Sequence, residues 1–268
     1  MIITERVFLT DDKVNYIDTY VYSDDRIKPM DAILVIPGGG YGCVCSDREG
    51  EPIALAFASR GVNAFVLNYH TGNGQNYPTQ LLDAARAVAY IKENAAKYHI
   101  DPDRVFVVGF SAGGHLAGSV ATMYEEAEDL LGYERKSVRP HGVIMAYPVV
   151  SAYSPTHNGS FVNLLGKDFA LITDSERERF SIEKRVSAST PPAFIWHTAE
   201  DKTVPIHGSL NLIKAYLDAG VAVEAHVYPY GPHGLALADE TTSVANPEMI
   251  QKKAQNWVNE SIKWMKTV

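Results

Sequence analysis

The run Gly109-Phe-Ser111-Ala-Gly113, which fits Gly-x-Ser-x-Gly, is the strongest constraint on how this chain can fold. Residues 104–108 before it form a short valine-rich segment typical of a buried strand, and residues 115–126 after it indicate a helix. Glycine at both ends of the run permits a tight turn, because a Cβ there would collide with the facing backbone. A serine at the tip of such a turn sits in a strained backbone region and stands above the sheet. The pattern therefore predicts that Ser111 is a nucleophile.

Short apolar segments alternate with helical patterns along most of the chain. Segments typical of parallel strands buried on both faces lie at 32–36, 62–67, 105–108, 142–146 and 193–196. Helices are expected at 51–59, 79–98, 207–219 and 248–266, and a last strand at 226–228. The residues at 7–9 and 16–22 follow the alternating pattern of strands with one face in water, and this pattern predicts an antiparallel hairpin. We therefore predict an α/β fold with a mostly parallel central sheet and helices on both faces.

The 268 residues have room for one large domain, and no linker-like stretch divides them. We predict a single domain over residues 1–268. A polar, irregular stretch at residues 151–190 is too long for a plain connection. Because it follows the strand that ends near Tyr147, we expect this insertion to form a small cap over the site.

Composition limits the partners of the chain. A net charge of −8 argues against nucleic-acid binding, and the scattered lysines and arginines form no polybasic membrane patch. Residues 1–13 are too charged for a secretory signal, and no run of 18 apolar residues predicts a membrane helix. Cys43 and Cys45 are spaced poorly for a disulfide and are expected to be small loop residues in a reducing compartment. We predict a cytoplasmic protein without membrane or nucleic-acid partners, and a homodimer from base rates.

A serine nucleophile needs a base, an acid that orients the base, and donors for the developing oxyanion. His233 lies in a glycine- and proline-rich loop after the last predicted strand, at the carboxyl end of the sheet. Asp201 follows the strand at 193–196 and is the predicted acid, with Glu200 as the alternative. His115 lies one turn into a helix and is expected to pack rather than react.

The glycine run Pro37-Gly-Gly-Gly-Tyr41 follows the strand at 32–36. Neither a Walker lysine nor a Gly-x-Gly-x-x-Gly pattern accompanies it, so phosphate binding is not indicated. The predicted oxyanion donors are the backbone amides of Gly39 and Gly40, together with that of Ala112 at a helix N-terminus. No metal or organic cofactor is needed for this chemistry.

Aromatic side chains near these loops are candidates for lining the substrate pocket. Each has the alternative of being an ordinary core residue. The predicted substrate-binding residues are Tyr41, Tyr69 and Tyr153, and Trp196 is a further candidate.

Seven motifs between about residues 30 and 265 are informative in combination. They are Pro37-Gly-Gly-Gly-Tyr41, Leu67-Asn-Tyr69, Tyr77-Pro-x4-Asp83, Gly109-Phe-Ser-Ala-Gly-Gly-His-Leu-Ala117, Thr190-Pro-Pro192, Asp201-x2-Val-Pro205 and Gly231-Pro-His-Gly234. Together they resemble the acetyl-xylan and feruloyl esterase-like branch of the α/β-hydrolases. The resemblance implies an α/β-hydrolase fold, with Ser111, Asp201 and His233 as catalytic triad and the glycine run with Ala112 as oxyanion hole.

Two departures from relatives concern the neighbourhood of the glycine run. Pro37 stands where hormone-sensitive-lipase-like loops carry histidine, which argues against that subgroup. His70 stands where relatives often have arginine after the Tyr69 position, so the support of the oxyanion loop is expected to differ.

These observations predict a serine carboxylesterase whose partner is a small-molecule ester. We expect it to remove short acyl groups, acetyl in particular, from small alcohols or sugars. Two alternatives stay open: an amide hydrolase on the same triad, such as an arylformamidase or small peptidase, and a non-catalytic binding protein that keeps the fold.

Overall fold

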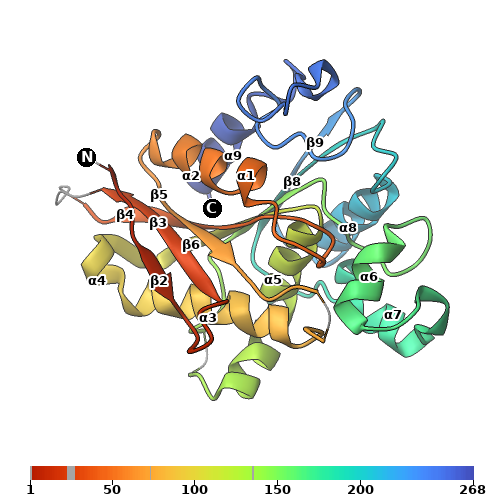
Figure 1. The fold of residues 1–268 in the computed structure, drawn as a ribbon, viewed down its shortest axis with the longest axis horizontal. Helices are drawn as coiled ribbons and strands as arrows, with labels where there is room; N and C mark the ends of the chain where they lie inside the picture. The colour runs from red at the N-terminus through yellow and green to blue at the C-terminus, as the bar shows by residue number, and fades with distance from the viewer. Residues whose placement is uncertain (1, 23–27, 73, 135) are drawn as a thin grey trace.

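A central sheet organises the molecule, for which the computed structural model describes residues 2–22, 28–72, 74–134 and 136–268 (Figure 1). Over these ranges the strand order is β1-β3-β5-β4-β6-β7-β8-β9, and β2 pairs with β3. The strands are β1 (Ile2–Ile3), β2 (Arg6–Phe8), β3 (Tyr16–Tyr22), β4 (Met30–Ile36), β5 (Asn63–Asn68), β6 (Ile100–Phe110), β7 (Val143–Ala146), β8 (Ala193–Thr198) and β9 (Val223–Tyr228).

The direction of the strands agrees with the prediction. From β4 through β9 every neighbouring pair is parallel, including β4 with β5. The first strands form the expected antiparallel hairpin, with Val7 of β2 opposite Ile17 of β3. Strand β3 then joins the sheet antiparallel to β5. The result is a mostly parallel sheet with an antiparallel start.

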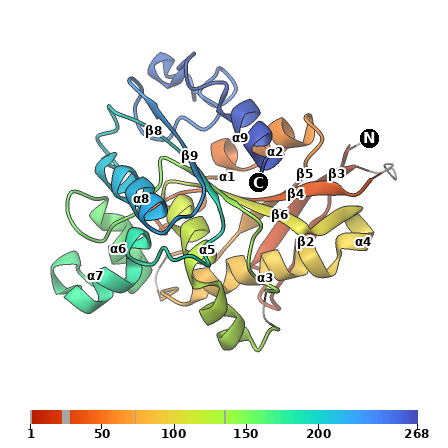
Figure 2. The ribbon, with the colours of Figure 1, turned by 180° about the vertical axis from the view of Figure 1, so that it is seen from behind.

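Helices cover both faces of this sheet (Figures 1 and 2). Alternate residues of β4 separate the two layers. Leu34 belongs to the buried cluster that includes residues of α3, α5 and α8, whereas Val35 belongs to the cluster that includes residues of α2 and α9. The helices are α1 (Ser46–Glu49), α2 (Glu51–Ala58), α3 (Thr79–Glu93), α4 (Ala95–Tyr98), α5 (Ala112–Leu131), α6 (Asn158–Leu165), α7 (Asp174–Phe180), α8 (His207–Asp218) and α9 (Trp257–Met265). Short 3-10 turns lie at Phe169–Leu171, Ile182–Lys184 and Pro247–Met249.

Two predicted helices are shorter or divided. The helix expected at 79–98 breaks at Asn94, whose side chain donates to the Tyr90 carbonyl at 2.8 Å and ends α3. The helix expected at 248–266 is α-helical only in α9, which follows the 3-10 turn at Pro247–Met249. Before α9, the Gln251 N–H donates to the Ala238 carbonyl at 2.9 Å, a tertiary bond that replaces a helical one. Tertiary contacts overrode the helical pattern there.

The stretch at 151–190 lies between β7 and β8 and contains α6, α7 and two 3-10 turns. Phe161 of α6 and Phe180 of α7 are buried in the core shared with α3 and α5. Figures 1 and 2 show α6 and α7 side by side, next to α5 and α8. Because the strands from β4 to β9 are parallel, their carboxyl ends meet at one edge, where open α/β sheets form their sites.

Candidate active site

Ser111 occupies the sharp turn between β6 and α5. Its φ is 54° and its ψ is −120°, a left-handed conformation that a serine adopts only at a cost of about 1–3 kcal/mol. A Cβ on Gly109 would lie 2.1 Å from the Gly113 carbonyl oxygen, and one on Gly113 would lie 2.2 Å from that of Ile36. Both glycines of the motif are therefore required by close backbone contact, as predicted.

His233 and Asp201 come from two other loops at the same edge of the sheet. His233 Nε2 lies 2.8 Å from Ser111 Oγ, and His233 Nδ1 lies 2.6 Å from Asp201 Oδ2. Asp201 follows β8, and His233 follows β9. The three residues selected from the sequence thus form one continuous hydrogen-bonded line. Glu200, the alternative acid, is exposed and accepts from the Gly231 N–H at 3.2 Å instead.

Asp201 is held by more than one partner. Its Oδ1 accepts from the N–H groups of Thr203 and Val204 at 2.9 and 2.8 Å. Its Oδ2 also lies 3.1 Å from His197 Nε2. Burial alone would raise the pKa of this carboxyl, but hydrogen bonds from His197 and His233 hold it well below the usual range. Asp201 is therefore ionised and fixed in orientation at neutral pH.

The second histidine, His197, supports the acid. Its Nε2 lies 2.9 Å from the Val204 carbonyl oxygen as well as near Asp201, and both of these groups only accept. Nε2 therefore carries a proton, and Nδ1 lies 2.8 Å from Ser209 Oγ.

The glycine run leads from β4 past the nucleophile. Gly39 and Gly40 have φ values of 124° and 61° and line the cavity beside Ser111. A Cβ on Gly39 would lie 2.2 Å from the Cys43 carbonyl oxygen, so this tight loop needs glycine there. Ala112 is the first residue of α5, where the backbone N–H has no intrahelical partner. The predicted oxyanion donors thus lie around one serine.

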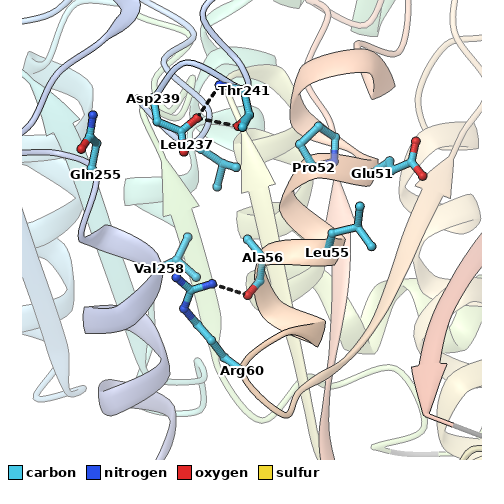
Figure 3. Close-up of a pocket in the computed structure, with 10 residues that line it drawn as sticks. All are labelled: Glu51, Pro52, Leu55, Ala56, Arg60, Leu237, Asp239, Thr241, Gln255 and Val258. Carbon is cyan, nitrogen blue, oxygen red and sulfur yellow. Dashed lines mark hydrogen bonds between the residues drawn. The ribbon is translucent and has the colours of Figure 1, made fainter. Parts of the chain in front are cut away.

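The cavity at Ser111 is small, with a volume of about 190 Å³. It is lined by Gly39, Gly40, Cys45, Arg48, Glu49, Ser111, His157, Thr203, His233 and Gly234. A second hollow of about 450 Å³ continues from His233 and Thr203 along polar side chains that include Lys202 and Gln251. A third cavity of about 470 Å³ lies between α2 and the segment leading into α9, and no predicted site residue lines it (Figure 3).

The three tyrosines predicted to bind substrate do not line the Ser111 cavity. Tyr41 and Tyr69 are 1% exposed, and Trp196 is also in the core. Buried hydroxyls need partners: Tyr41 Oη lies 2.7 Å from His115 Nδ1, and Tyr69 Oη donates to the Pro37 carbonyl at 2.9 Å. Tyr153 points to Glu178, 3.3 Å away. Tyr41 and Tyr69 therefore brace the glycine loop from inside the core.

His115 packs as expected. It is buried, with Nε2 donating to the Phe180 carbonyl at 2.8 Å and Nδ1 accepting from Tyr41. Burial lowers its pKa to about 4, so the ring is neutral near pH 7. It joins the glycine loop to the end of α7.

Glu49, Arg48 and His157 are site residues that sequence reasoning missed. His157 lies at the start of α6, and its Nδ1 is 2.9 Å from Ser160 Oγ, which leaves Nε2 for the cavity. Burial, with the nearby His233, lowers the pKa of His157. Its only signal in the sequence was its position in the 151–190 insertion. Arg48 Nη1 donates to the Gly234 carbonyl at 3.4 Å.

His70 forms a two-sided ion pair. Its Nδ1 lies 2.7 Å from buried Asp83 and its Nε2 lies 2.8 Å from Asp12. Burial opposes the charge on His70, but the hydrogen bonds that its ring N–H groups donate to Asp83 and Asp12 outweigh it and raise the pKa of the imidazole. His70 thus anchors the chain directly after Tyr69.

We expect His70→Gln to destabilise the protein by about 1–3 kcal/mol at pH 6, and by less as the pH rises. The raised pKa means that the contribution of the charge is complete below pH of about 6.5 and is lost as the pH passes the pKa in the folded state. Urea unfolding of both proteins between pH 6 and pH 9 measures the difference. A difference in unfolding free energy that is constant with pH would contradict the charged pair.

No group of three or more His, Cys, Asp or Glu side chains within the described ranges is arranged to hold a metal ion. Cys43 and Cys45 are free thiols. In the same part of the chain, no helix combines the length and apolar character needed to cross a membrane.

A serine on a strained turn, flanked by histidine, aspartate and a glycine loop at the carboxyl edge of a mostly parallel sheet, defines the α/β-hydrolase class. The BD-FAE family model matches residues 17–217, and the chain belongs to this family of α/β-hydrolases.

Curated relatives agree with this membership. Endo-1,4-beta-xylanase B of Butyrivibrio fibrisolvens is 43% identical over 225 residues, covering 82% of this chain and 34% of that protein. The acetylxylan esterase of Xylanibacter ruminicola is 32% identical over 210 residues, covering 76% of this chain and 40% of that protein. The chain thus spans between a third and two fifths of these two relatives.

Solved structures match over nearly their whole length. The acetyl ester-xyloside bifunctional hydrolase from Caldicellulosiruptor lactoaceticus is 32% identical with a TM-score of 0.81, covering 98% of this chain and 96% of that one. The carboxylesterase Cest-2923 from Lactobacillus plantarum is 25% identical with a TM-score of 0.83, covering 100% and 97%. The α/β-hydrolase fold predicted from the sequence is confirmed.

Proposed function

We propose that this chain is a serine carboxylesterase that removes short acyl groups, acetyl in particular, from small alcohols or sugars. The observation that carries the proposal is the hydrogen-bonded line from Ser111 through His233 to Asp201, beside the cavity lined by Gly39 and Gly40. The relatives named acetylxylan esterase and acetyl ester-xyloside hydrolase support an acetyl ester as substrate.

In the proposed mechanism Ser111 Oγ attacks the ester carbonyl carbon while His233 Nε2 takes the hydroxyl proton. The carbonyl oxygen becomes an oxyanion, which the backbone N–H groups of Gly39, Gly40 and Ala112 stabilise; one such donor is worth about 2.7–4 kcal/mol. The C–O bond to the alcohol then breaks, and His233 returns the proton to the leaving oxygen. Water, activated by His233, hydrolyses the acyl-enzyme in the same way. Asp201 keeps Nδ1 protonated and stabilises the imidazolium.

The shape of the site supports a short acyl group and a polar alcohol. The cavity of about 190 Å³ is below the roughly 300–1,000 Å³ of sites for larger ligands. The adjoining hollow, lined by Lys202 and Gln251 among others, offers hydrogen-bonding groups suited to a hydroxylated alcohol. We infer that the insertion at 151–190 acts as a small cap, because it supplies His157 to the cavity wall.

We expect kcat/KM for p-nitrophenyl esters to fall about tenfold or more from acetyl to hexanoyl, since added methylenes exceed the cavity. The same assay with acetylated xylo-oligosaccharides, a formyl amide and a peptide panel tests the bond that is cleaved. An amide cleaved with much higher kcat/KM than any ester would contradict the esterase proposal. Failure of a fluorophosphonate probe to label Ser111 would favour a non-catalytic protein.

Two further predictions rest on the sequence alone. These are the cytoplasmic location and the homodimer, and both stay predictions. Light scattering on the purified chain measures the second.

A further inference from the structure

Glu49 lies against the two loops that serve the proposed reaction, and the inference below rests on that proposed function. This residue ends α1, is 3% exposed, and lines the cavity of Ser111. Burying a carboxylate is costly unless hydrogen bonds compensate. Its partners therefore indicate what this side chain is held in place to do.

The first partner is the glycine loop. Glu49 Oε2 accepts from the Gly38 N–H at 2.7 Å. A Cβ on Gly38 would lie 2.8 Å from that same oxygen and 3.0 Å from Ser111 Cβ. Gly38 is thus held between the carboxylate and the nucleophile, and this bond sets the course of the loop into Gly39 and Gly40.

The second partner leads to the histidine loop. Tyr147 Oη donates to Glu49 Oε1 at 2.8 Å and accepts from the Ala236 N–H at 3.0 Å. Ala236 is three residues beyond His233, and the Tyr147 ring meets the His233 ring edge-on with centroids 5.1 Å apart. Tyr147 itself has a φ of 36°, a strained conformation for a side chain of this size. One carboxylate and one tyrosine therefore tie the oxyanion loop to the histidine loop.

The hydrogen bonds fit an ionised Glu49. Both partners donate, and an ionised carboxylate only accepts. Burial leaves the pKa of Glu49 above its usual value, although the bonds from Tyr147 and Gly38 and the charges of His233 and Arg48 oppose that rise.

The other titratable groups near Glu49 and His233 are Cys45, Tyr69, Asp201 and His157. Burial raises the pKa of Cys45 to about 11 and raises that of Tyr69 strongly, so both are neutral near pH 7. Asp201 is ionised, and the lowered pKa of His157 keeps that ring neutral.

We propose that Glu49 is a positioning residue for the reaction. Its carboxylate aligns the oxyanion loop with the histidine loop through Gly38 and Tyr147. Its negative charge stabilises the imidazolium that His233 becomes when Ser111 attacks.

Glu49→Gln keeps the volume and removes the charge. With p-nitrophenyl acetate we expect kcat to fall about ten- to a hundredfold, with little change in KM. The acid limb of the kcat/KM profile moves to lower pH, because protonated His233 loses a neighbouring negative charge. Glu51→Gln is the matched control: Glu51 is exposed on α2, lies beside the third cavity (Figure 3), and leaves kcat and the profile unchanged.

Glu49→Asp separates charge from geometry. It shortens the side chain and so lowers kcat, but it keeps the charge, and the acid limb stays near its wild-type position. The proposal is overturned if Glu49→Gln has a wild-type kcat. It is also overturned if the acid limb of Glu49→Gln stays at its wild-type position, or if Glu49→Asp moves the acid limb as far as Glu49→Gln does. If the Glu49 variants do not fold, Tyr147→Phe decides: a several-fold fall in kcat supports the link, and a wild-type kcat overturns it.

These results are distinguishable from failure of the proposed function. A wild-type protein without ester hydrolysis, or one whose hydrolysis does not depend on Ser111, contradicts the esterase proposal. A Ser111-dependent esterase that is indifferent to Glu49→Gln contradicts only the role of Glu49.

Discussion

We expect Ser111→Ala to reduce kcat for p-nitrophenyl acetate by about six orders of magnitude, to the background of the assay, and to leave the fold intact. The loss is this large because the hydroxyl that forms the acyl-enzyme is gone, and His233 Nε2, 2.8 Å from Ser111 Oγ, has no proton to take. Alanine keeps the Cβ and the backbone strain at φ 54°, so we expect the melting temperature to change by only a few degrees.

The matched control for this variant is Ser59→Ala. Ser59 is exposed at the end of α2, where its Oγ donates to the Ala56 carbonyl at 2.9 Å, and its loss should leave kcat unchanged. Steady-state kinetics with circular dichroism checks both variants. Substantial turnover in folded Ser111→Ala would remove Ser111 as the nucleophile and the esterase mechanism with it.

The second large effect is expected for Asp201→Asn, which should lower kcat about 10⁴-fold with little change in KM. The cause is the hydrogen-bond pattern around the carboxylate. Two backbone N–H groups, from Thr203 and Val204, point at Oδ1, so an asparagine must turn its oxygen toward them. Its NH₂ group then faces His233 Nδ1, which has to accept. The proton moves to Nε2, and His233 can no longer take the proton of Ser111.

Glu200→Gln tests the choice of acid. Glu200 is exposed and bonds to the Gly231 N–H rather than to His233, so we expect less than a tenfold change in kcat. Equal losses in the two variants would show that Asp201 has no special role. Measuring kcat and KM for both against wild type decides the matter.

The parts of the site that the sequence predicted are those with local signals. Gly109 and Gly113 mark a turn in which only glycine fits at these two positions, and this turn identifies Ser111 as the nucleophile candidate. Asp201 and His233 each follow a strand in a loop, and parallel strands bring their carboxyl ends to one edge. Their proximity therefore followed from the strand pattern, and the distances of 2.8 and 2.6 Å agree with it.

The structure differs from the sequence-based expectations at residues whose place depends on distant partners. Tyr41 and Tyr69 look the same in the sequence whether they line a pocket or pack in the core. Their hydroxyls are taken by His115 and the Pro37 carbonyl, so they support the glycine loop from behind. The helix expected at 248–266 was shortened for the same kind of reason, because Gln251 bonds to Ala238.

The sequence by itself determined the fold class, the strained turn at Ser111, the order of the triad candidates and the glycine loop. Each of these depends on short-range backbone geometry or on the direction of buried strands, which local residue patterns encode. Only the tertiary structure decided that Glu49 is buried between two loops, that His157 reaches the cavity, and that Tyr147 bridges to Ala236. The two contacts of Tyr147 join residues 98 and 89 positions apart, and whether a charged side chain is buried depends on all that packs around it.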